Sequence, residues 1–114
     1  MKVYSYAQCS TCRKAIAWLK ERGIATTLID ITATPPSLAE LKAGMAQLGR
    51  KRLFNTSGQS YRALGSASVQ AMDDQQAIAA LAADGKLVKR PFVVTETGQV
   101  LTGFKPEEWE ALLD

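Results

Sequence analysis

The chain has 114 residues, of which 46% are hydrophobic and 22% charged, and its formal net charge is +3. This length and composition are typical of one globular domain and exclude a disordered tail or a collagen-like fibre. The sequence contains no histidine and two cysteines, which excludes histidine-based catalysis and a zinc site built from histidine and cysteine ligands. Thiols, carboxylates, hydroxyls and arginines remain to carry any chemistry.

The N-terminal segment predicts a strand, a helix and a second strand. Residues 2–6 alternate polar and apolar side chains, and residues 26–31 are rich in Thr, Ile and Leu, so both are predicted strands. From Ser10 to Gly23 the apolar residues recur at helical spacing, and glycine stands where a helix ends. A crossover of helical length between two strands predicts that they pair in parallel.

The middle of the chain predicts two helices separated by an irregular segment. After the break at Pro35-Pro36, a capping box and a buried stripe at helical spacing predict a helix that ends at Gly49, with Ser37, Glu40, Leu38, Leu41, Met45 and Leu48 as its marker residues. Residues 50–66 predict irregular surface structure with short turns. A second helix is expected after Asp73 or Asp74, with Ala77, Ile78 and Leu81 on its inner face.

The C-terminal segment predicts a hairpin and a last helix. Residues 92–95 and 100–104 read as strands around a turn at Thr97-Gly98. Pro106 suits the first position of a helix, and Trp109, Leu112 and Leu113 are expected on its inner side.

This order of elements predicts an α/β chain with a thioredoxin-like fold: β-α-β, a helical segment, then β-β-α around a mixed four-stranded sheet. We expect a single domain over residues 1–114. Residues 1–31 and 87–114 would form the thioredoxin-like core, and residues 32–86 a mostly helical insertion.

The location and general partners follow from composition. No run of about 18 apolar residues is present, so no membrane span is predicted, and the N-terminus lacks the pattern of a secretory signal. We therefore expect a cytoplasmic protein with no membrane association, a compartment in which a close cysteine pair is more often redox-active or catalytic than structural. The basic excess is small and matches no nucleic-acid-binding motif, so no direct nucleic-acid contact is expected.

Cys9 and Cys12 form a C-x-x-C motif between the first predicted strand and helix. The free N–H groups and positive dipole at a helix start stabilise a thiolate on Cys9, and Arg13 and Lys14 add positive charge in the same turn. Cys12, one turn further, is close enough to resolve a mixed disulfide. We expect Cys9 to be the attacking thiolate and Cys12 the resolving thiol. The alternative is a pair of small helix-start residues without a redox role.

A second feature is the basic pair followed by proline, Lys89-Arg90-Pro91. If the peptide bond before Pro91 is cis, the preceding backbone turns toward the Cys9 loop. Arg90 would then lie near the thiolate and bind an oxyanion or a leaving group. The alternative is a solvated arginine in a basic loop.

Three further features have structural interpretations. Trp18 and Trp109 are expected to pack in or beside the core. Glu107-Glu108 suits the positive end of the last helix and does not make a catalytic dyad, since adjacent helical residues face apart. The run Arg50-Lys51-Arg52 predicts a solvated turn, with a partner-docking patch as the alternative.

Four segments cover nearly the whole chain in order and separation: C-S-T-C-R-K-A-I-A-W-L, N-T-S-G-Q-S-Y-R-A-L, K-R-P-F-V-V and G-F-K-P-E-E-W. Together they resemble the arsenate reductase-like (ArsC/Spx) family. The resemblance implies a thioredoxin-like fold with a helical insertion. It also implies one of three activities: glutaredoxin-coupled arsenate reduction, redox-switched binding to the C-terminal domain of the RNA polymerase α-subunit as in the Spx regulators, or glutathione-dependent thiol reduction.

Residue by residue, the resemblance assigns Cys9 to the family's nucleophile, Cys12 to the second cysteine of the Spx switch, and Arg90 to the arginine before the proline. Two further arginines that surround arsenate in the reductases do not carry over, because their positions fall at Ser57 and near Gly103-Phe104. Each charge-assisted contact contributes roughly 1.5–3 kcal/mol. On this resemblance, efficient arsenate reduction is not expected, unless Arg62 or the run Arg50-Lys51-Arg52 replaces the two missing arginines.

Two functions follow from the resemblance. The first is a thiol-dependent oxidoreductase with thiol–disulfide chemistry at Cys9 and Cys12. It would have glutathione, glutaredoxin or thioredoxin as electron donor, Pro91 as a contact for glutathione or another thiol substrate, and neither a bound cofactor nor a metal. The alternative is a redox-switched transcriptional regulator of the Spx/MgsR branch that binds the RNA polymerase α-subunit, here without the charged C-terminal tail that Spx proteins carry.

Overall fold

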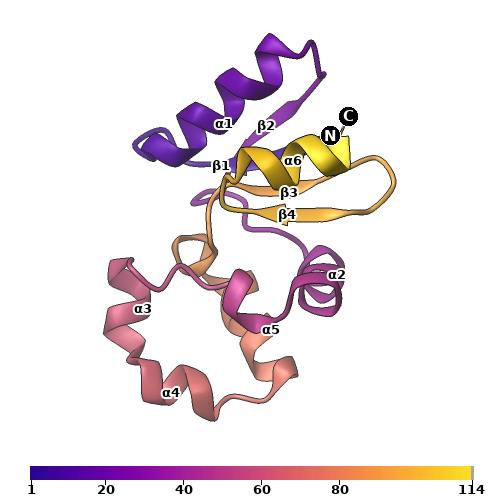
Figure 1. Cartoon of the computed structure of the whole chain (residues 1–114). Helices are drawn as coiled ribbons and strands as arrows, with labels where there is room; N and C mark the ends of the chain where they lie inside the picture. Colours follow the sequence, from indigo (N-terminus) through magenta and orange to yellow (C-terminus); the bar gives the residue numbers. More distant parts are fainter. Residues whose placement is uncertain (114) are drawn as a thin grey trace.

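A computed structural model describes residues 1–113 of the chain (Figure 1). The strands are β1 (Lys2–Ser5), β2 (Thr27–Asp30), β3 (Phe92–Val94) and β4 (Val100–Thr102). The helices are α1 (Ser10–Glu21), α2 (Leu38–Leu48), α3 (Gln59–Leu64), α4 (Ser66–Ala71), α5 (Asp74–Ala83) and α6 (Pro106–Leu113), with short 3-10 helices η1 (Arg50–Arg52) and η2 (Gly85–Leu87). Asp114 lies outside the described residues. The expected absence of a charged C-terminal tail, which concerns this end of the chain, stays a prediction.

The four strands form one mixed sheet in the order β2-β1-β3-β4. β1 and β2 are parallel, and the pairs β1–β3 and β3–β4 are antiparallel. The predicted β-α-β unit and the predicted hairpin are both confirmed. Because β1 and β3 lie side by side, the loop after β1 and the loop before β3 meet at one end of the sheet.

The two faces of the sheet contribute to different hydrophobic cores, because successive strand residues point to opposite sides. One core lies against α1 and α6 and contains Val3, Ala15, Leu19, Val93, Leu101 and Trp109. Trp18 packs edge-on against Trp109, with 5.9 Å between the ring centroids, so the expected packing role of both tryptophans is confirmed.

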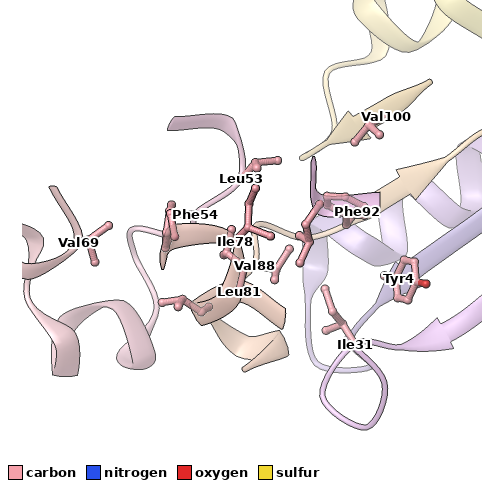
Figure 2. Close-up of a cluster of buried hydrophobic side chains, with 13 residues drawn as sticks. Tyr4, Ile31, Leu53, Phe54, Val69, Ile78, Leu81, Val88, Phe92 and Val100 are labelled. Atoms are coloured by element: carbon pink, nitrogen blue, oxygen red, sulfur yellow. The ribbon is translucent and has the colours of Figure 1, made fainter. Parts of the chain in front are cut away.

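The other core joins the sheet to the segment between β2 and β3. Figure 2 shows Tyr4, Phe92 and Val100 of the sheet at one end of this cluster and Phe54 and Val69 at the other. The helical segment therefore has a core that is continuous with the sheet. The predicted capping box is present at the first turn of α2, and Asp73, one of the two expected caps of α5, forms a second one with Gln76.

The prediction of irregular structure for residues 50–66 is wrong, because η1 and α3 lie within it and α4 follows directly. α3 is a short helix between Gly58 and Gly65. It is held by a contact with a residue outside the helix, since the Tyr61 ring packs edge-on against Phe54 at 6.1 Å. The helix propensities of the six residues of α3 do not reveal such a contact.

Two side chains predicted to face inward are exposed instead. Leu38 at the start of α2 and Leu112 near the end of α6 keep 53% and 46% of their surface accessible. Both lie in a terminal turn of a helix, where the packed face of the neighbouring elements no longer covers the stripe. The inner positions Leu41 and Trp109 are buried as expected.

The basic run at residues 50–52 is not the solvated turn that the sequence predicts. Arg50 is the first residue of η1, and its guanidinium donates to the carbonyls of Val69 and Met72 at 3.3 and 2.7 Å and to Asp74 at 2.7 Å. Arg52 donates to Glu108 in α6 at 2.9 Å. These arginines connect the helical segment to itself and to the last helix.

None of the helices in the described part of the chain is both long and apolar enough to cross a membrane.

Candidate functional site

Cys9 is the N-cap of α1, immediately after the loop that follows β1. Its backbone N–H donates to the Tyr6 carbonyl at 3.0 Å, and its Sγ accepts a hydrogen bond from the Cys12 N–H at 3.1 Å. The sulfur thus receives one of the N–H groups that a helix start leaves without an intrahelical partner. A thiolate at this place is stabilised by that bond and by the helix dipole.

Cys12 lies directly behind Cys9 and is completely buried. Burial, and then the hydrogen bond to Cys9, raise the pKa of the Cys12 thiol to about 12, whereas the positive charge of Arg90 acts in the opposite direction. At neutral pH this thiol is therefore protonated. Cys9 is only partly buried, so the two thiols differ in access to solvent.

Arg90 lies in the loop before β3, next to a cis peptide bond at Arg90-Pro91. Its guanidinium carbon lies 5.0 Å from the centre of the Tyr6 ring, within cation–π range. Tyr6 belongs to the loop that leads to Cys9. The two loops that the sheet topology brings together therefore place Arg90 and Cys9 on the same side of the molecule.

A cavity of about 480 Å³ opens beside Cys9. Its wall comes from the start of α1, the loop after η1, the loop before β3 and the segment from β4 to α6, with Gln8, Cys9, Ser10, Thr11, Asn55, Ser57, Lys89, Arg90, Thr102, Gly103, Phe104 and Lys105 as lining residues. No acidic side chain lines it within residues 1–113. The cavity is thus strongly cationic, in contrast to the small net charge of the whole chain.

Some of the residues predicted around Cys9 do not reach this cavity. Arg13 and Lys14 are exposed, and the Arg13 guanidinium donates to the carbonyl of Ala7 at 2.9 Å. Pro91 is buried and is not among the described residues that line the cavity. A contact between Pro91 and a thiol substrate stays a prediction.

The two positions at which the family resemblance implies further arginines do line this cavity. Ser57 donates to the Asn55 side chain at 3.3 Å. Gly103 has φ of +65°, and a Cβ built there would lie 3.2 Å from Cε of Lys89. The Lys89 side chain therefore passes close to position 103 and brings a cation to this part of the cavity.

Thr102, at the end of β4, is a buried polar lining residue that the sequence analysis missed, as it also missed Asn55 and Lys105. Its exposed fraction is 2%, and its hydroxyl has no hydrogen-bond partner within residues 1–113. A buried unpaired hydroxyl is uncommon in folded proteins. The alternation of the last strand contained a signal, because Thr102 shares the parity of the buried Val100 and is the polar member of that face.

A second cavity of about 490 Å³ adjoins the first and shares Asn55, Ser57 and Arg90 with it. Arg62 lines this second cavity and does not line the first. Arg90 therefore lies where the two cavities meet. Within the described residues, no group of three or more Cys, Asp and Glu side chains is arranged to hold a metal ion.

The sequence matches the profile of the ArsC family over residues 4–112. YusI of Bacillus subtilis is 42% identical over 110 residues, which cover 94% of this chain and 92% of the relative. An arsenate reductase of Neisseria meningitidis is 31% identical over 116 residues, covering 99% of this chain and 97% of that protein.

The regulator Spx of Listeria innocua is 27% identical over 108 residues, which cover 93% of this chain and 81% of that protein. Among solved structures, a crystal structure of an ArsC family related protein from Bacteroides fragilis superimposes with a TM-score of 0.88. It is 48% identical and covers 97% of this chain and 95% of that chain. The thioredoxin-like architecture expected from the order of elements agrees with these neighbours.

Proposed function

This chain belongs to the ArsC family, and we propose that it acts as a thiol–disulfide oxidoreductase with Cys9 as nucleophile and Cys12 as resolving thiol. The observation that carries the proposal is the pairing of a partly exposed thiol in a cationic cavity with a buried thiol directly behind it. The two thiols of this pair would react in a fixed order, because only Cys9 is accessible to a substrate.

In the first step the Cys9 thiolate attacks one sulfur of a disulfide R–S–S–R′. The Cys9–S–R bond forms, the substrate S–S bond breaks, and R′–S⁻ leaves and takes a proton from solvent. In the second step Cys12 loses its proton and attacks Sγ of Cys9, so that a Cys9–Cys12 disulfide forms and R–S⁻ leaves. Two equivalents of a small external thiol then reduce the protein disulfide.

The buried state of Cys12 suits the second step. While Cys9 is a thiolate, the Cys12 proton is held by burial and by the bond to Cys9. Once Cys9 carries a substituent, its negative charge disappears and that bond weakens. Cys12 then loses its proton more readily, which favours attack only after the first step has occurred.

Arg90 is proposed as the residue that stabilises the departing thiolate. Its position at the junction of the two cavities, beside Tyr6, supports this role. A guanidinium keeps its charge at all relevant pH values and donates several hydrogen bonds. A departing sulfur anion next to Arg90 would therefore be stabilised as its charge develops.

A disulfide is favoured over arsenate as the substrate. Arsenate needs dense cationic contact, and the cavity offers Ser57 and Gly103 where the reductases have arginines. Lys89 supplies charge near position 103, but an ammonium does not reproduce the bidentate contact of a guanidinium. We propose glutathione or glutaredoxin as the electron donor, since thiols of this kind complete the cycle without a bound cofactor.

The test is intact-mass analysis after exposure to a disulfide such as oxidised glutathione. The wild-type protein should lose two hydrogens and form the internal disulfide. Cys12→Ser should instead accumulate one covalent adduct on Cys9, while Cys9→Ser should remain unmodified because its remaining thiol is buried. An adduct on Cys12 in the Cys9→Ser protein, or no adduct on Cys12→Ser, would contradict the assigned roles.

A second function is favoured by the C-x-x-C pair together with the similarity to the Spx protein of Listeria over most of the chain. In this alternative, oxidation of Cys9 and Cys12 changes a docking surface for the C-terminal domain of the RNA polymerase α-subunit. Pull-down with the reduced and the oxidised protein tests it. Binding that depends on the oxidation state supports the regulator, and no association in either state removes it.

A further inference from the structure

The start of α1 and the end of β4 both contribute to the wall of the cavity beside Cys9. On the α1 side, Cys9, Ser10 and Thr11 line it. On the β4 side, Thr102 and Gly103 line it. A molecule attached to Cys9 within this cavity therefore shares it with the end of β4.

The Thr102 hydroxyl is the buried polar group on this wall without a protein partner. Residues of β4 alternate between the two cores, and Thr102 follows the same side as Val100, which is buried against the helical segment. At Thr102 the strand reaches the cavity, where no described donor or acceptor meets the hydroxyl. An unpaired buried hydroxyl costs free energy unless a ligand or a water pairs with it.

Two lysines line the same cavity as Thr102. Lys89 passes close to Gly103, the residue after Thr102, and is in no ion pair within residues 1–113. Lys105 lies 3.7 Å from Glu108, so part of its charge is compensated. A hydroxyl donor in a cavity lined by two ammonium groups is suited to an oxygen that carries negative charge.

From this arrangement we propose that the wall formed by Thr102, Lys89 and Lys105 is a carboxylate subsite, which selects small acidic disulfides for attack by Cys9. The proposal rests on the proposed thiol–disulfide chemistry and names its substrate class. The Thr102 hydroxyl donates to a carboxylate oxygen of the half that becomes attached to Cys9. Lys89 and Lys105 supply the charge.

The chemical step is the one already described, with a defined substrate. Cys9 attacks one sulfur of 3,3′-dithiodipropionate, the substrate S–S bond breaks, and one 3-mercaptopropionate leaves. The other half remains linked to Cys9 with its carboxylate on the subsite. Cys12 then displaces it as a second 3-mercaptopropionate and forms the internal disulfide.

Three small disulfides with the same two-methylene spacer between the sulfur and the terminal group separate the effect of charge from that of size. These are 3,3′-dithiodipropionate with two negative charges, bis(2-hydroxyethyl) disulfide with none, and cystamine with two positive charges. The rate of oxidation of the wild-type protein should decrease in this order. Equal rates for all three, after correction for their rates with a short cysteine-containing peptide, would overturn the subsite.

Thr102→Val tests the hydroxyl at nearly constant volume, with Thr102→Ser as the matched variant that restores it. Thr102→Val should lower the rate with 3,3′-dithiodipropionate by about tenfold or more and leave the cystamine rate unchanged, and Thr102→Ser should recover most of the loss. The unfolding midpoint of Thr102→Val should be equal or higher, because an unpaired buried hydroxyl is removed. A lower midpoint with unchanged charge selectivity would show a structural role only.

A binding measurement separates the subsite from the chemistry. Calorimetric titration of Cys9→Ser with 3,3′-dithiodipropionate should show binding that is lost in Cys9→Ser/Thr102→Val. If this binding is present but wild-type Cys9 reacts with none of the three disulfides, the subsite stands and the proposed oxidoreductase function fails. If Cys9 reacts but the acidic disulfide does not bind, the subsite is wrong and the oxidoreductase function stands.

Discussion

Two groups of basic residues in this molecule have opposite surroundings. In the helical segment, Arg50 and Arg52 each reach defined acceptors, which are backbone carbonyls and carboxylates. At the end of the sheet, Lys89 and Arg90 line an open cavity that has no acidic side chain in the described part of the chain. Paired cations of the first kind hold elements together, whereas unpaired cations around a thiol are available to a ligand. The same residue types therefore serve stability in one region and binding in the other.

The largest expected effect lies in the structural region, at Gly85. A Cβ there would lie 1.7 Å from the backbone oxygen of Ile31, so Gly85→Ala forces two main-chain segments apart. We expect a loss of about 3 kcal/mol in the free energy of unfolding, measured by urea denaturation. Gly23→Ala is the control, since its site has φ of +67° and open space and should lose only about 1 kcal/mol. Equal losses would refute the close approach to Ile31.

The next largest expected loss in the free energy of unfolding is that of Arg50→Ala. It removes hydrogen bonds to Val69, Met72 and Asp74, and since 27% of the Arg50 side chain is exposed, we expect a loss of about 2 kcal/mol. Lys51→Ala, at the exposed neighbouring position, should change stability by less than about 0.5 kcal/mol. The alkylation rate of Cys9 should be the same in both variants. A slower rate in Arg50→Ala would mean that the two regions are not independent.

Arg90→Ala should have the opposite effect to Arg50→Ala: a slower reaction of Cys9 with little change in stability. Removing the guanidinium should slow the reaction of Cys9 with oxidised glutathione by about tenfold, while the unfolding midpoint changes little. Lys14→Ala removes the same charge from an exposed site that does not line the cavity, and its rate should stay near that of the wild-type protein. Equal slowing in both variants would indicate that only the net charge matters.

The smallest predicted effect is a pH dependence at Glu40. Burial opposes its ionisation, but hydrogen bonds from Tyr4, Ser37 and Lys2 hold the pKa of Glu40 below its ordinary value. The folded state thus gains stability from this carboxylate above about pH 4.5, and the gain is lost as the pH falls below that value. Urea midpoints at pH 7 and pH 3 should differ less in Glu40→Gln than in the wild-type protein. An equal difference would exclude this contribution.

The features that the sequence predicted correctly are those determined locally. The capping residues Ser37 and Asp73 mark their helices through contacts three residues away, the alternation of residues 2–6 marks β1, and the apolar run after Pro91 marks β3. Cys12 is buried because it falls on the inner face of α1, which the helical spacing already indicates. Local patterns of this kind need no knowledge of the tertiary structure.

The features that the sequence did not predict depend on contacts between separate elements. Arg50 finds its acceptors 19 and more residues away, and α3 packs through Tyr61 against Phe54, which precedes the helix. Thr102 and Lys89 meet at the cavity only because β3 and β4 pair in a particular register. A pattern confined to one segment contains none of this information.

The central claim is that Cys9 is a reactive thiolate in a cationic cavity, and alkylation with two matched reagents tests it directly. Iodoacetate and iodoacetamide carry the same leaving group and differ in charge. We predict that the rate ratio of iodoacetate to iodoacetamide at Cys9 exceeds the ratio for a short cysteine-containing peptide, and that added salt reduces the excess. A ratio equal to that of the peptide at low salt would contradict the account.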